Sequence, residues 1–149
     1  MKFFLGSADF SIVQFATTET RVTGLSSSNV VIPFLNGLNY TGGSTNQSEA
    51  LLTCQQSLIT STNTDRRNVI LLITDGVPER PKVDQFDEAR PSVVLVKDKG
   101  THISPVFIGG QNQEQLNYMR SLSSDGEVLQ RTSFGELSTL VQGLQTPII

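Results

Sequence analysis

Two residues of this chain could together bind a ligand or metal: a carboxylate and a hydroxyl, each next to a predicted loop. Asp75 follows the run Val69–Thr74, which is almost purely apolar, and precedes Gly76. Such a run suits a strand covered on both faces within a parallel sheet, and open α/β sheets keep their ligand crevices at the carboxyl ends of such strands. Asp75 is therefore either a ligand-binding group or the cap of a turn with Gly76.

Thr45 is the second candidate, and it lies in the glycine-containing loop Tyr40–Asn46. This loop leads into a predicted helix whose start has two possible capping boxes, Ser44 with Gln47 or Asn46 with Glu49. We expect Thr45 and Asp75 to lie at the same carboxyl edge of the sheet. A hydroxyl and a carboxylate, together with water, are hard ligands suited to Mg²⁺, Ca²⁺ or Mn²⁺.

Other reactive residue types in the chain have a simpler interpretation. Cys54 shares an apolar spacing with Leu51 and Leu58, which favours a packed core thiol over a nucleophile, and a single cysteine excludes an internal disulfide. His102 is the only histidine, and we expect it to be structural or at the surface. Gly109-Gly110 lacks the residues of a phosphate loop and is read as a turn. We therefore predict that the chain is not an enzyme.

Strands that alternate with helices must position Thr45 and Asp75. The apolar patterns predict strands at 10–15, 17–23, 69–73, 101–108 and 127–131, and helices at 31–38, 46–58, 84–99, 113–123 and 133–144. The polar segment 17–23 suits an antiparallel edge strand, while Pro105 predicts a bulge and Pro91 a delayed or kinked helix. The sequence thus predicts a single α/β domain over residues 1–149, with a mostly parallel open sheet and helices on both faces.

Composition excludes several classes of protein. The 11 basic and 14 acidic residues give a net charge of −3 without any block of one sign, so nucleic acid is not an expected partner. The longest apolar run is too short to span a membrane. The apolar stretch that ends before Gly6-Ser7 is likewise too short for a signal peptide.

Five segments, taken in order, resemble a von Willebrand factor type A domain, which is also the inserted domain of integrins. They are Phe10–Ala16, Thr20–Val22, Tyr40–Asn46, Val69–Gly76 and Ile103–Gly109. The resemblance implies a Rossmann-like fold and a non-enzymatic module for cell adhesion or protein binding. It also implies an extracellular or cell-surface location.

The resemblance further implies a metal-ion-dependent adhesion site. Thr45 matches the threonine that can bind the cation directly, and Asp75 matches the aspartate that usually acts through water. The third loop of that site, Asp-x-Ser-x-Ser after the first strand, is absent, and the nearest string is Asp9–Val13. Since Met1–Gly6 resembles the end of the family's first helix, we expect an N-terminally truncated domain that binds Mg²⁺, Mn²⁺ or Ca²⁺ weakly or not at all.

The missing strand would be central in the sheet, between the strands at 10–15 and 69–73. Either these two strands pair directly, or a gap with apolar edges remains, and such edges invite self-association. Two glycosylation sequons, at Asn39 and Asn46, bracket the loop with Thr45, and a glycan at Asn46 would crowd the site.

Three functions follow as hypotheses. The first is an adhesion module in which an acidic residue of a protein ligand completes the coordination of a cation held by Thr45 and Asp75. The second is an interaction scaffold of the same fold that does not depend on metal. The third is a receiver-like signalling domain, which also places an aspartate at a strand end but would need an acidic pair and a late lysine that are absent here.

Overall fold

In the computed structural model, the described residues are 8–39, 42–43, 45–59, 66–76, 85–109 and 112–145. The strands are β1 (Asp9–Phe10), β2 (Val13–Phe15), β3 (Glu19–Arg21), β4 (Ser26–Ser27), β5 (Val69–Thr74), β6 (His102–Ile108) and β7 (Leu129–Arg131). The helices are α1 (Ser28–Asn36), α2 (Gln47–Ile59), α3 (Gln85–Asp98), α4 (Gln113–Leu122) and α5 (Phe134–Gln145).

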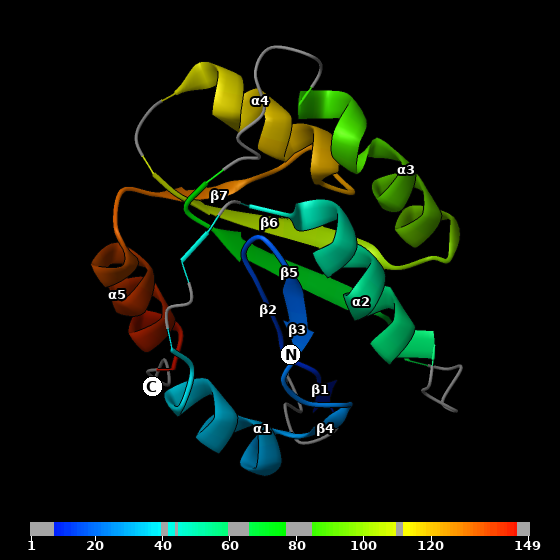
Figure 1. Cartoon of the computed structure of the whole chain (residues 1–149). Helices are drawn as coiled ribbons and strands as arrows, with labels where there is room; N and C mark the ends of the chain where they lie inside the picture. Colours follow the sequence, from blue (N-terminus) through cyan, green and yellow to red (C-terminus); the bar gives the residue numbers. More distant parts are fainter. Residues whose placement is uncertain are drawn as a thin grey trace.

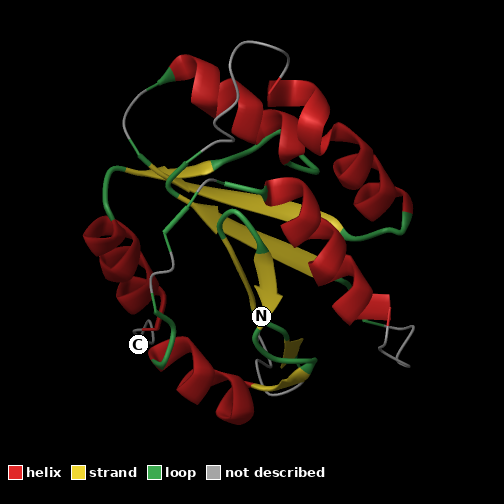
Figure 2. Ribbon diagram, viewed as in Figure 1, coloured by secondary structure: helices red, strands yellow, loops and turns green. Residues whose placement is uncertain are grey.

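The predicted α/β architecture is confirmed by a parallel sheet with the order β5-β6-β7. Helices α2, α3 and α4 lie on one side of this sheet, and α5 and α1 lie on the other (Figures 1 and 2). The main core lies between the sheet and the first group of helices, and it contains Leu51, Ile70, Leu72, Val96, Ile103, Phe107, Met119 and Leu122. The apolar residues Leu116, Met119 and Leu122 of α4 therefore face the core.

The predicted antiparallel pair is also confirmed, because β2 and β3 form a hairpin. The expected strand 10–15 is interrupted, however, and its first part pairs with β4 instead. The break has a side-chain cause: the Ser11 hydroxyl donates to the Thr23 carbonyl oxygen at 2.7 Å, and the Thr23 hydroxyl accepts from the Ile12 N–H at 3.1 Å. The Thr23 hydroxyl thus takes up the Ile12 N–H in place of a backbone partner, while the Ile12 carbonyl oxygen still accepts from the Val22 N–H at 2.8 Å.

Within the described residues the β2–β3 hairpin does not join the parallel sheet, since the two form separate sheets. Of the two outcomes expected from the sequence, direct pairing or a gap with apolar edges, the gap is the one found. The hairpin instead packs against α2.

The prediction that Val69–Ile73 is covered on both faces is wrong. Burial alternates along β5: Ile70 and Leu72 are buried, whereas Leu71 is 61 % exposed and Val69 and Ile73 are exposed too. The reason is tertiary. Helix α5 packs against β7, and α1 packs against β1 and β4, so neither covers the outer face of β5.

The bulge predicted at Pro105 is also absent, because the register between β5 and β6 runs without interruption through Leu72 and Pro105. Backbone groups alternate in direction along a strand. The His102 N–H donates to Asn68 in the β5 direction, and the Gly109 N–H donates to Arg131 in the β7 direction. Residue 105 is an even number of positions from Gly109, so its backbone groups face the same side of β6, toward β7. The backbone ladder between β6 and β7 begins only at Val106, so the N–H that Pro105 lacks would have had no partner there.

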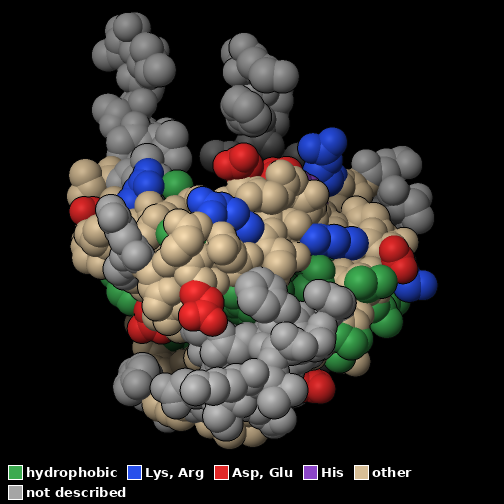
Figure 3. All heavy atoms as spheres, turned by 90° about the horizontal axis from the view of Figure 1, so that it is seen from above, with side chains coloured by type: hydrophobic (Ala, Val, Ile, Leu, Met, Phe, Trp, Pro, Cys, Tyr) green, Lys and Arg blue, Asp and Glu red, His purple; other side chains and the backbone are tan. Residues whose placement is uncertain are grey.

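Helix α3 begins at Gln85 and runs through Pro91, so the proline does not delay its start. Helix α1 begins at Ser28, earlier than the predicted 31–38, and contains Pro33. None of the described helices has the length and apolar character needed to cross a bilayer. On the face seen in Figure 3, acidic and basic side chains are interspersed rather than gathered by sign.

Candidate cation-binding edge

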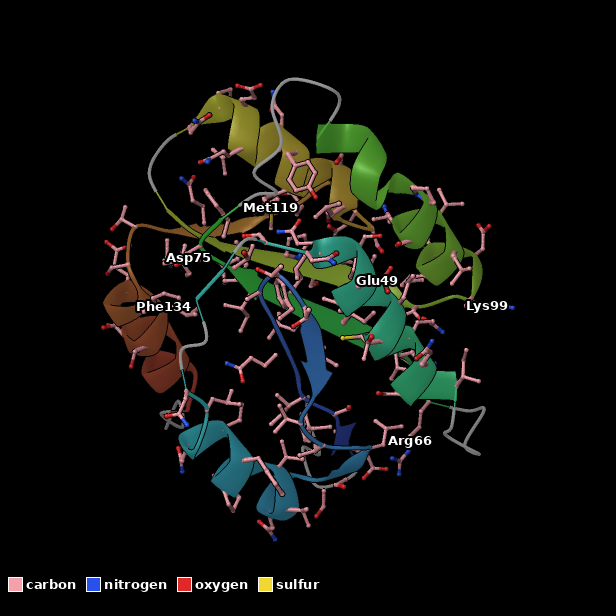
Figure 4. All side chains as sticks on the ribbon, viewed as in Figure 1. Glu49, Arg66, Asp75, Lys99, Met119 and Phe134 are labelled. Atoms are coloured by element: carbon pink, nitrogen blue, oxygen red, sulfur yellow. The ribbon has the colours of Figure 1, made fainter. Side chains whose placement is uncertain are left out.

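Thr45 and Asp75 lie at the same edge of the molecule, as the sequence predicts. Asp75 is exposed directly after β5, and Figure 4 shows it at the opposite end of that strand from Arg66. Thr45 lies two residues before α2, and its hydroxyl is so near the turn after β5 that a Cβ on Gly76 would lie 3.2 Å from its Oγ1 atom. The structure thus brings the hydroxyl loop against the aspartate–glycine turn.

The turn at Gly76 is fixed by buried polar groups. The Thr74 hydroxyl donates to the Gly76 carbonyl oxygen at 3.0 Å and accepts from the Gly76 N–H at 3.2 Å. Gln47 is fully buried, and its Nε2 donates to the same carbonyl at 3.2 Å while its Oε1 accepts from the Tyr118 hydroxyl at 2.7 Å. Satisfied buried networks of this kind hold a backbone in one geometry.

From the sequence, Gln47 is predicted only as part of a possible helix cap, so its role in the turn was missed. A signal was available, since Gln47 precedes Leu51, Cys54 and Leu58 at helical spacings of four, seven and eleven residues. That spacing places it on the apolar face of α2. A buried glutamine on such a face needs hydrogen-bond partners, and these turn out to be the turn after β5 and α4.

The loop with Thr45 is held from the side of β2. The Asn46 N–H donates to the Ala16 carbonyl oxygen at 2.8 Å, and the Asn46 Oδ1 accepts from the Glu49 N–H at 3.2 Å. This second bond confirms Asn46 as the cap of α2, whereas Ser44 is outside the described residues. Gly43 has φ +101°, and a Cβ there would clash with the Thr17 hydroxyl, so this position requires glycine.

Asp9–Val13, the string nearest to the absent third loop, does not reach this edge. Asp9 forms an ion pair with Arg66, ahead of the amino end of β5. The six residues of β5 span about 20 Å between the two ends. Ser11 is likewise engaged, by Thr23. These residues therefore cannot supply the missing ligands next to Asp75.

The donor set has the right chemistry for a hard cation but too few members. Thr45 supplies one hydroxyl and Asp75 one carboxylate, and the part of the chain that the structure describes holds no group of three or more His, Cys, Asp or Glu side chains placed to hold a metal. Mg²⁺ takes octahedral coordination and usually keeps several waters. A cation here would need most of its ligands from water or from a partner.

The remaining candidates lie apart from this edge. Burial raises the pKa of the Cys54 thiol to about 11, which agrees with the predicted packed thiol. His102 is at the amino end of β6, and its Nε2 lies 3.7 Å from an oxygen of Asp125. Hydrogen bonds from the Ser123 hydroxyl and the Glu127 N–H lower the pKa of Asp125. Within the described part of the chain, neither Cys54 nor His102 is therefore joined to Asp75.

The open parallel sheet, with a threonine loop packed against an aspartate–glycine turn at its carboxyl edge, defines an open α/β domain, the class of fold whose ligand crevices lie at that edge. The family model of the von Willebrand factor type A domain matches residues 5–143. The chain belongs to this family.

Solved structures support the fold. Proximal thread matrix protein 1 from the mussel byssus is 20 % identical, with a TM-score of 0.73 over 93 % of this chain and 36 % of that chain. A second structure of that mussel protein has a zinc-occupied adhesion-site motif, at 19 % identity and a TM-score of 0.71, over 91 % of this chain and 35 % of that chain. The SpRpn10 VWA domain is 18 % identical, with a TM-score of 0.67 over 94 % of this chain and 72 % of its own. This chain therefore spans about a third of the mussel protein's length. A comparison with curated protein sequences finds no match.

Proposed function

We propose that this domain is an adhesion or protein-binding module whose binding edge carries Thr45 and Asp75. A divalent cation, Mg²⁺ or else Mn²⁺ or Ca²⁺, would be held there weakly, and an acidic residue of a protein partner would complete its coordination. The observation that carries this proposal is the packing of the Thr45 hydroxyl against the Asp75-Gly76 turn. Family membership supports it, and the two loops resemble those of the family's metal-ion-dependent adhesion site.

The local geometry suits a site that is held ready for a partner. Thr74 and Gln47 fix the turn from below, while Asp75 itself stays exposed. An exposed carboxylate on a rigid turn can be brought to a cation without rearrangement of the backbone, which lowers the entropic cost of binding. In this arrangement the chain's own residues bind and orient, and no catalytic step is proposed.

A metal-independent scaffold of the same fold is the second candidate, and a different observation favours it. The described residues offer only two ligands for the cation, whereas α1 exposes several large apolar side chains that could contact a protein directly. These are Val30, Ile32, Phe34 and Leu35. Contiguous exposed apolar surface commonly marks a site of protein interaction.

An extracellular or cell-surface location is part of the proposal, as is common for adhesion modules. Two sequons are compatible with it, at Asn39 and Asn46. Asn39 is exposed and open to glycosylation. Asn46 is half-buried and caps α2, so a glycan there would disturb the loop that carries Thr45.

The test is a surface-binding assay of the folded chain against a panel of immobilised matrix and cell-surface proteins, in Mg²⁺ and in chelator. We expect binding that disappears in chelator and on Thr45→Ala or Asp75→Ala. Lys99→Ala is the matched control, since Lys99 lies far from Asp75 (Figure 4). Binding that ignores the chelator and both site changes would support the metal-independent scaffold, and a folded chain that binds no protein of the panel would count against both.

A further inference from the structure

The two loops that carry Thr45 and Asp75 are joined by a buried side chain. Gln47 follows Thr45 by two residues at the start of α2, and its Nε2 donates to the Gly76 carbonyl oxygen at 3.2 Å. The register between β5 and β6 ends at Thr74, so Asp75 and Gly76 lie beyond the paired part of the strand. The spacing of the two loops therefore depends on the bond from Gln47.

The hydrogen bonds between Thr74 and Gly76 are local and serve a different purpose. The Thr74 hydroxyl donates to the Gly76 carbonyl oxygen at 3.0 Å and accepts from the Gly76 N–H at 3.2 Å. Both bonds lie within three consecutive residues, so they fix the shape of the turn but move with it. Gln47 belongs to a different element, and the bond from its side chain fixes where the turn lies relative to the loop that carries Thr45.

The Tyr118 hydroxyl keeps the Gln47 amide in place. A carbonyl oxygen can only accept a hydrogen bond, so the Gly76 oxygen requires the amide Nε2 on its side. The Gln47 Oε1 then points to α4, where it accepts from the Tyr118 hydroxyl at 2.7 Å. Gln47 and Tyr118 are both fully buried. Without the Tyr118 hydroxyl, Oε1 would lose this donor inside the core, and the amide would be drawn away from Gly76 to find another.

We propose that Gln47 and Tyr118 are positioning residues of the binding edge: together they set the spacing between Thr45 and Asp75, and through it the affinity for a cation. Neither residue reaches the surface, so neither binds the cation itself. The claim about affinity rests on the proposed function, whereas the spacing of the two loops is a property of the chain without metal. The two parts can therefore be tested separately.

The same hydrogen bonds link helix α4 to the binding edge. Three apolar side chains anchor this helix in the main core, namely Leu116, Met119 and Leu122. Its opposite face is exposed to solvent. A displacement of α4 would be transmitted from Tyr118 through Gln47 to the Gly76 carbonyl oxygen, by two hydrogen bonds in series. The position of α4 is thereby coupled to the edge without any contact to the cation.

Helix α2 carries a second buried glutamine that provides a matched control. Gln55 lies two turns after Gln47, and its Oε1 accepts from the Thr101 hydroxyl at 2.8 Å. Thr101 directly precedes the amino end of β6, whereas Asp75 follows the carboxyl end of β5. Thr101→Val and Tyr118→Phe each remove a buried hydrogen bond from a hydroxyl to a glutamine of the same helix. Of these two bonds, only that of Tyr118 belongs to the network at the turn.

The test compares Tyr118→Phe, Gln47→Met and Thr101→Val with the parent chain by NMR, first without metal and then in Mn²⁺. Circular dichroism melts establish that each variant is folded. Without metal, the Gly76 amide should exchange about three- to tenfold faster in Tyr118→Phe and in Gln47→Met, since the turn loses the support of a buried hydrogen bond. In Mn²⁺, the broadening of the Asp75 and Gly76 signals at a given metal concentration should fall by a similar factor. Thr101→Val should change neither measurement, although it also loses a buried bond.

Unchanged exchange at Gly76 in folded Tyr118→Phe and Gln47→Met would overturn the proposal. So would an equal effect of Thr101→Val, which would indicate a general loosening of the core. Faster exchange at Gly76 with unchanged Mn²⁺ broadening would overturn the claim that the spacing of the loops sets the affinity. If Mn²⁺ broadens no signal of the parent chain, the proposed function fails and the claim about affinity fails with it, while the exchange without metal still decides whether Gln47 and Tyr118 position the loops.

Discussion

Adjacent leucines in β5 should respond very differently to truncation. Leu72 is 4 % exposed and belongs to the main core, whereas Leu71 is 61 % exposed on the outer face. A fully buried leucine changed to alanine costs about 2–5 kcal/mol, so Leu72→Ala should cost about 3 kcal/mol and lower Tm by about 6–12 °C in a chain of this size. Little more than a third of the surface of Leu71 is buried, so Leu71→Ala should lower the unfolding free energy by about 1 kcal/mol or less.

The assay is equilibrium unfolding in urea, followed by circular dichroism, on the two variants and the parent chain. Because the two changes remove the same atoms from neighbouring residues of one strand, each is the control for the other. Equal losses of unfolding free energy would contradict the reasoning, since they would show that the outer face of β5 is covered. A smaller effect at Leu72 than at Leu71 would reverse the assignment of the core face.

Three further changes probe the site and its surroundings. Gln47→Ala removes two buried hydrogen bonds and should lower the unfolding free energy in urea by about 2–3 kcal/mol. Gln56→Ala, on the exposed side of the same helix, should lower it by about 0.5 kcal/mol or less. Equal losses would mean that the buried network contributes nothing to stability. Because burial raises the pKa of Cys54 from 9.0 to about 11, its thiol should be alkylated about a hundredfold more slowly at pH 8 in the folded chain than in denaturant. An alkylation rate that unfolding does not change would refute the burial of Cys54. Ser123→Ala should raise the pKa of Asp125 in an NMR titration. Because the folded-state pKa of Asp125 is lowered from 3.8, this carboxyl stabilises the parent chain above that pH and loses the effect as pH falls through the lowered pKa. An unchanged titration would show that the Ser123 hydroxyl does not lower the pKa of Asp125.

The sequence predicted the placement of Thr45 and Asp75 at one edge better than it predicted which helices cover the sheet. Thr45 and Asp75 could be placed at one edge because strand ends and loops are local features with strong signals, an apolar run that stops and a glycine turn. The cap at Asn46 was likewise one of two local alternatives. The structure brings these residues together through the direction of parallel strands, which the alternation of strands and helices already implies.

What failed depends on contacts between distant segments. The run Val69–Ile73 reads as buried on both faces, yet no apolar pattern shows whether a helix covers the outer face. Pro105 was expected to distort its strand. Only the alternating direction of backbone groups along β6 shows that its missing N–H faces β7, before the ladder between β6 and β7 begins. The break at Ser11 coincides with bonds to Thr23, whose carbonyl oxygen accepts from the Ser11 hydroxyl and whose own hydroxyl accepts from the Ile12 N–H. Each error therefore concerns tertiary context rather than local preference.

The most direct test of the proposed binding edge is the paramagnetic effect of Mn²⁺ on the amide signals of the isotopically labelled chain. The account predicts that the signals of Thr45, Asp75 and Gly76 broaden first, that the dissociation constant is in the millimolar range, and that Mg²⁺ reverses the effect. Asp98→Asn, at the end of α3, should change nothing, whereas Asp75→Asn should abolish the broadening. Broadening that begins elsewhere, such as around Asp125, or that persists in the Asp75→Asn variant, would contradict the account.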